Sequence, residues 1–139
     1  MATTIRAQLS EKNKYYIDKH RHYELKHFCL QYPAWKKAYT DCLDGGVPMS
    51  MIDGVKRNDG LYDPTSARAT TRAHYHKRMQ LLEQVAKDAD RYLWQYILKA
   101  VTEGLSYTYL KTKLDIPCGK DMYYDRYRRF FWLLSEIRD

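Results

Sequence analysis

The chain has 139 residues, of which 45% are hydrophobic and 29% charged, with a formal net charge of +7 at pH 7. This length allows one compact domain, and the evenly mixed charges exclude a disordered tail. Only six glycines and four prolines stand beside 14 tyrosines, which favours long helices over strands and turns. These values predict an all-α protein, built as a helical bundle.

The cysteines and the hydropathy of the chain indicate the cellular compartment in which the protein is expected. Cys29, Cys42 and Cys118 are odd in number and unrelated in spacing. Residues 1–14 are polar, and no apolar run approaches the roughly 20 residues that a membrane span needs. We therefore expect a cytoplasmic protein with reduced thiols and no membrane partner.

The first predicted helix covers about residues 16–31, where Tyr32-Pro33 interrupts it. A second helix follows and ends at Gly45-Gly46, a strong stop signal. Residues 46–62 show no apolar period and are predicted to form a flexible loop. This pattern divides the chain into an N-terminal helical segment (1–45), the loop, and a helical domain (63–139).

The first helix of this domain has a clear predicted start, because Asp63 suits the N-cap and Pro64 suits the first helical position. The helix is expected to run to about Lys87 and to bury Ala69, Ala73, Met79, Leu82, Val85 and Ala86. Asp88 or Asp90 can start the next helix, which is expected to end at Gly104.

The last two predicted helices form a pair. Ser106 is expected to cap a short helix that reaches Leu114 and turns Tyr109 and Leu110 inward. Residues 115–119 break the helix, and Ile116 supplies an apolar plug for a tight corner. A final helix is predicted over 120–137. A short helix, a brief turn and a longer helix form the geometry of a C-terminal helix-turn-helix, although other helical corners share the pattern.

A helical wheel divides the final helix into two faces. The apolar face comprises Met122, Tyr123, Tyr127, Phe130, Leu133, Leu134 and Ile137. The opposite face carries Lys120, Asp121, Tyr124, Asp125, Arg128 and Arg129. These six are candidate DNA contacts, since arginine can read guanine and a carboxylate can accept a hydrogen bond from cytosine. The alternative is an ordinary solvated face.

The stretches 96–110 and 116–131 resemble the phage late transcriptional regulators of the RinA/ArpU type, whose helix-turn-helix is similar to region four of primary sigma factors. Cys118-Gly119-Lys120 stands at the opening of the recognition helix, Met122-Tyr123 at the aromatic position and 126–129 at the basic position. The resemblance covers about residues 63–139. It implies a non-enzymatic regulator that binds double-stranded DNA of a phage or prophage in the bacterial host, with RNA polymerase as a candidate further partner.

Four other side chains carry expectations. Arg68 and Arg72 are candidate phosphate contacts, and the alternative, which the pattern slightly favours, is a solvated helix face. Arg126 lies at the edge of the apolar face and is expected to pair with a carboxylate of the preceding helices. Trp132 falls on the polar side, which indicates either a partner or homodimer contact or burial under the N-terminal segment.

No metal or catalytic site is expected. The histidines lack the paired ligand spacing of a structural zinc site. No nucleophile motif, glycine-rich phosphate loop or carboxylate pair at a defined spacing occurs, and no cofactor is expected. Two rival functions remain open beside DNA-binding regulation. One is a phage-encoded inhibitor that binds a protein through a helix-turn-helix scaffold, and the other is a DNA-packaging or replication accessory protein.

Overall fold

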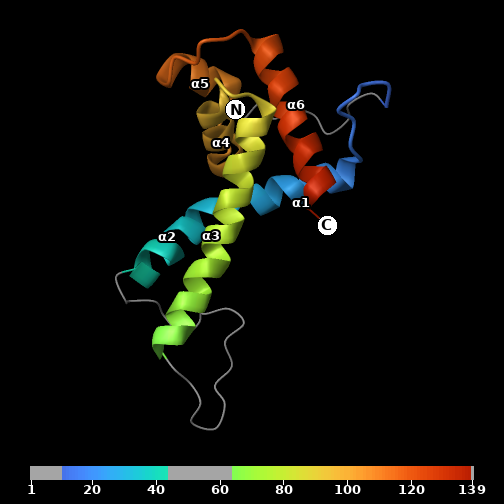
Figure 1. Cartoon of the computed structure of the whole chain (residues 1–139). Coiled ribbons are helices and arrows are strands. Elements are labelled where there is room, and N and C mark those ends of the chain that lie inside the picture. Colours follow the sequence, from blue (N-terminus) through green and yellow to red (C-terminus); the bar gives the residue numbers. More distant parts are fainter. Residues whose placement is uncertain (1–10, 44–63, 139) are drawn as a thin grey trace. The chain divides into compact units, whose positions relative to one another are not determined.

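The computed structural model describes residues 11–43 and 64–138 (Figure 1). All regular secondary structure in these residues is helical, which confirms the predicted all-α class. Six helices occur there: α1 (Lys19–Leu30), α2 (Tyr32–Leu43), α3 (Pro64–Ala89), α4 (Trp94–Glu103), α5 (Tyr107–Lys113) and α6 (Lys120–Ile137). The predicted loop at 46–62 and the capping residue Asp63 lie outside the described residues.

Local signals account for several helix ends. The side chain of Ser106 accepts a hydrogen bond from the Tyr109 N–H at 3.2 Å, which starts α5 as expected. Gly104 ends α4 with a φ of 70°, a left-handed conformation that glycine adopts without a steric penalty. The bounds of α6 agree with the predicted range 120–137.

The described residues form two compact units, one made of residues 11–31 and 82–138, the other of residues 32–43 and 64–81. The predicted division of the chain at residues 45 and 63 stays a prediction, since the loop between them lies outside the described residues. α1 belongs to the first unit because it packs against α4 and α6. The reason lies in the apolar side of α1, where Leu25 and Cys29 are fully buried. A sequence pattern shows that a helix has such a side but not which helix will cover it.

The first unit contains α1, the end of α3, and α4 to α6. Its fully buried side chains include Leu82, Ile97, Leu110 and Leu134. The guanidinium of Arg21 in α1 donates hydrogen bonds to the backbone carbonyls of Ser135 and Arg138. These bonds join the start of α1 to the end of α6, and Figure 1 shows the C-terminal end of α6 crossing α1 at an angle.

The second unit contains α2 and the first part of α3. Trp35 and Ala38 of α2 are buried, and the Arg78 guanidinium lies 5.5 Å from the centre of the Trp35 ring. The expected burial of Ala69 and Ala73 was wrong, since both are exposed. Ala67 and Thr71 are buried in their place, so the apolar side of α3 is turned by about half a helical turn here.

The buried face of α6 agrees with the predicted one at Tyr123, Tyr127, Phe130 and Leu134, and differs from it at both edges. Met122 and Ile137 are 47% and 58% exposed, whereas Phe131 is buried. The edge of the Phe131 ring lies against His22 of α1, with ring centroids 5.0 Å apart. The wheel was therefore centred wrongly because α1, distant in sequence, covers the Phe131 side. Tyr109, expected to point inward, is 42% exposed, while Leu110 is buried as predicted.

Candidate nucleic-acid interface

The connection between α5 and α6 is held from several directions. Ile116 is completely buried, as its expected role as an apolar plug requires, and its N–H donates to the Leu110 carbonyl at 3.1 Å. The hydroxyl of Tyr107 donates to the Cys118 carbonyl at 2.8 Å. Asp115 has a positive φ of 52°, which reverses the chain direction within a few residues. These contacts set the angle at which α6 leaves the turn.

Aromatic rings hold the first half of α6 against the first unit. Tyr123 is completely buried, and its ring centroid lies 5.6 Å from Tyr107 of α5 and 5.9 Å from Tyr127. Burial raises the pKa of both Tyr123 and Tyr127 far above the usual range for tyrosine. The Tyr123 hydroxyl has no hydrogen-bond partner among the described residues. These rings fix the rotation of α6 about its axis.

Three of the six candidate DNA contacts on α6 remain available to a ligand. Lys120 and Asp121 are exposed in the first turn. Arg128 is half-buried, and its Nε atom is enclosed without a hydrogen-bond partner in the described part of the chain. An arginine in this position can still extend its terminal nitrogens outward, because the guanidinium has several donors.

Tyr124, a fourth candidate, is partly used by the protein. It is half-buried, and its ring centroid lies 6.3 Å from that of Tyr107. Burial raises the pKa of its hydroxyl, and a hydrogen bond with the Tyr107 backbone together with the nearby Arg128 opposes this rise. The Tyr124 side chain therefore contacts α5 and is only partly available at the surface.

The remaining two candidates on α6 have partners within the first unit. Asp125 forms an ion pair with Arg126 at 3.0 Å. Arg129 donates to the backbone carbonyl of Asp88 at 3.4 Å and to the hydroxyl of Tyr15 at 3.3 Å. The hydrogen bond from Arg129 lowers the pKa of Tyr15. Both side chains would have to give up these contacts in order to bind DNA.

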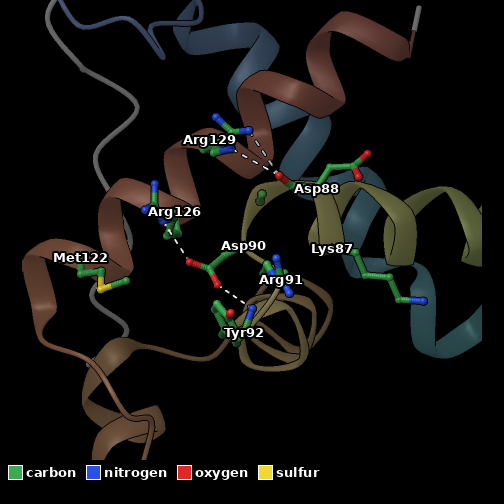
Figure 2. Close-up of a pocket in the computed structure, with 9 residues that line it drawn as sticks. Lys87, Asp88, Asp90, Arg91, Tyr92, Met122, Arg126 and Arg129 are labelled. Carbon is green, nitrogen blue, oxygen red and sulfur yellow. Dashed lines mark hydrogen bonds and ion pairs between the residues drawn. The ribbon is translucent and has the colours of Figure 1, made fainter.

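Arg126 pairs with a carboxylate that precedes α4, as predicted. Its Nε lies 3.0 Å from one carboxylate oxygen of Asp90, whose side chain is only 7% exposed. The other Asp90 oxygen accepts hydrogen bonds from the N–H groups of Tyr92 and Leu93, each at 2.8 Å. One buried carboxylate thus holds both α6 and the turn before α4. The helix itself begins later than the predicted start at Asp88 or Asp90, because Leu93 is its N-cap. Figure 2 shows Arg126 and Arg129 both reaching toward the end of α3.

The two candidates outside α6 belong to the second unit. Arg72 is exposed and Arg68 is half-buried. Both lie near Cys42 of α2, where they partly oppose the rise in the thiol pKa that burial produces. The eight candidate residues therefore fall into two units, with six in the first and two in the second.

Trp132 is half-buried and packs against Tyr15, with ring centroids 5.8 Å apart. This contact corresponds to burial under the N-terminal segment, one of the two expected alternatives. The ring nevertheless retains some exposed surface at the side of α6.

An open groove lies beside α6, where α3 ends and α4 begins, and it was not anticipated from the sequence. Its volume is about 610 Å³, and its wall includes Lys87, Asp88, Asp90, Arg91, Tyr92, Met122, Arg126 and Arg129 (Figure 2). Two features of the sequence pointed to this region: the helix start predicted at Asp88 or Asp90, and the carboxylate partner expected for Arg126. Neither signal shows that the exposed side chains of two helices face one another across a groove.

The described residues were also searched for a metal site and for a membrane-spanning helix. Among residues 11–43 and 64–138, no three His, Cys, Asp or Glu side chains gather closely enough to hold a metal ion. No helix described in the structure has the length and apolar character to cross a membrane. No family model, curated protein or solved structure matches the chain.

Proposed function

We propose that the protein is a sequence-specific DNA-binding regulator of transcription, with α6 as the helix that enters the major groove. The observation that carries this proposal is the polar surface of the first half of α6. Lys120, Asp121 and Arg128 have no ion-pair partner among the described residues. The opposite side of the same half-helix is held rigidly by buried rings. Recognition helices present base-reading side chains from this half.

The elements before α6 support the same proposal. The seven-residue helix α5 is followed by a six-residue connection and the 18-residue helix α6. A short helix followed by a longer one is the order of elements in a helix-turn-helix, although this connection is longer than the usual turn of three or four residues. The buried plug Ile116 and the bond from Tyr107 to the Cys118 carbonyl make the corner tight.

Each candidate side chain has a role in this proposed DNA complex. Arg128 reads guanine, because its terminal guanidinium nitrogens can donate to two acceptors on one base edge. Asp121 accepts a hydrogen bond from cytosine, and Lys120 contacts phosphate at the start of the helix. Arg68 and Arg72 supply further phosphate contacts from the second unit. Asp125 and Arg129 serve mainly to hold α6 in place.

The resemblance to phage late regulators supplies the biological setting of the proposal. The regulator acts at a phage or prophage promoter in the cytoplasm of a bacterial host, with RNA polymerase as its protein partner. A second copy of the chain is the other candidate partner, because many operators that bind helix-turn-helix proteins contain two half-sites.

Selection of binding sites from random duplex DNA with the full chain tests the proposal. We expect one preferred sequence and an affinity that falls steeply with salt, since bound phosphates release counterions. Failure to bind any duplex at low salt would reject DNA binding and favour the protein-binding inhibitor. Binding without any preferred sequence would favour the packaging or replication role.

Two arginine variants separate base reading from phosphate contact. Arg128→Ala should cost on the order of 1–3 kcal/mol at the preferred site and relax specificity at one position. Arg72→Ala, the matched control, should weaken preferred and random duplex alike. An equal loss on both duplexes for Arg128→Ala would reduce Arg128 to a phosphate contact.

A further inference from the structure

The groove beside α6 combines exposed apolar side chains with basic ones. Tyr92, in the turn before α4, is 77% exposed, and Met122 of α6 is 47% exposed; both line the groove. Large exposed hydrophobic side chains that share one hollow are typical of surfaces that bind another molecule. The groove is also large enough to receive several side chains of a partner.

The charges that the groove presents are mainly positive. Asp90 lies in its wall, but its carboxylate is 7% exposed and already paired with Arg126. The exposed charges that remain are Lys87 and Arg91 against Asp88, together with half-buried Arg129. A ligand in the groove therefore meets more positive than negative charge.

Two of these cations are held in position by aromatic rings. The Arg91 guanidinium lies 5.0 Å from the centre of the Tyr92 ring, and the Lys87 ammonium lies 4.9 Å from the centre of the Trp94 ring. Stacking of this kind restricts a long flexible side chain before a ligand arrives, which lowers the entropic cost of binding. The rim of the groove is thus partly arranged in advance.

We propose that this groove binds an acidic peptide segment of a partner protein. An apolar side chain of the peptide rests on Tyr92 and Met122, while neighbouring carboxylates pair with Lys87 and Arg91. Tyrosine, methionine and arginine are the residue types enriched where proteins meet, and methionine adapts its shape to an apolar guest. A DNA backbone would gain nothing from the Met122 thioether, which is why a peptide is the better occupant.

The proposal does not depend on DNA binding by α6. The α6 residues that line the groove are Met122, Arg126 and Arg129, which lie three or four residues apart and therefore on one side of the helix. Lys120, Asp121 and Arg128 are absent from its wall. Changes in the groove should accordingly leave the reading of a duplex intact.

The test begins with selection from a random displayed-peptide library against the full chain. A labelled peptide of the enriched consensus is then titrated against the wild type, Tyr92→Ala, Arg91→Glu and Tyr109→Ala by fluorescence anisotropy. Tyr109→Ala is the matched control, because this exposed tyrosine lies on α5 outside the groove. Circular dichroism establishes that each variant retains its helices.

We expect enriched peptides that combine acidic with aromatic or aliphatic residues. Tyr92→Ala and Arg91→Glu should each weaken binding by about tenfold or more, whereas Tyr109→Ala should leave it unchanged. The absence of acidic sequences, or equal binding by all variants, would overturn the proposal. So would a loss of duplex affinity in the two groove variants without peptide binding, which would make the groove a phosphate contact.

Discussion

Replacement of Tyr123 by phenylalanine should stabilise the protein. The Tyr123 side chain is completely buried, and its hydroxyl lacks a hydrogen-bond partner among the described residues. Burial of an unpaired hydroxyl costs about 1–3 kcal/mol, while the ring keeps its contacts with Tyr107 and Tyr127 when the oxygen is removed. We therefore expect Tyr123→Phe to raise the free energy of unfolding by about 1 kcal/mol or more.

The same chemical change at Tyr107 provides the control. Its hydroxyl donates to the Cys118 carbonyl at 2.8 Å and so joins α5 to the residues before α6. Loss of this bond should destabilise the protein by about 1 kcal/mol, so the two substitutions should act in opposite directions.

Urea unfolding followed by circular dichroism measures both effects, provided that the slope with denaturant stays constant. A clear destabilisation by Tyr123→Phe would show that the hydroxyl has a partner, and the described environment of the tyrosines would then be wrong.

Three further predictions concern stability. Asp90→Ala should lower the free energy of unfolding by about 2 kcal/mol, whereas Asp90→Asn should cost less because it keeps an oxygen for the N–H groups of Tyr92 and Leu93. Equal losses in urea melts would show that these two hydrogen bonds do not stabilise the turn before α4. Burial of His22 lowers its pKa to about 4, so the native state binds fewer protons than the unfolded state between about pH 6.5 and 4. Stability should consequently fall by up to about 3 kcal/mol as the pH drops through this window, and a wild-type slope that persists in His22→Gln would reject His22 as its source. Gly104→Ala should lower the free energy of unfolding by about 1–2 kcal/mol, because alanine disfavours the left-handed φ of 70°. The added methyl group would not clash, since it would lie 3.7 Å from Leu30. An unchanged thermal midpoint would contradict this prediction.

Short-range signals in the sequence were enough to predict many helix ends. Ser106 caps α5, Gly104 ends α4 and α6 covers the predicted range. Capping bonds and the steric limits on φ involve atoms only a few residues apart, so they can be read along the chain. The all-α class follows from the same local preferences.

The burial of individual side chains on α6 required the tertiary structure. Phe131 is buried because His22 of α1, more than a hundred residues earlier, lies against its ring, whereas Met122 lines the open groove and is 47% exposed. A helical wheel shows how broad an apolar face is, but its centre depends on where the neighbouring helices lie.

Tertiary contacts also decided which polar side chains of α6 stay available. Arg128 and Arg129 are adjacent, and the sequence treats them as equivalent candidates for DNA. Arg129 reaches the carbonyl of Asp88 and the hydroxyl of Tyr15, whereas the Nε of Arg128 has no partner among the described residues. A single step along a helix rotates a side chain by about 100°, so each of the two arginines meets a different set of atoms supplied by distant parts of the chain.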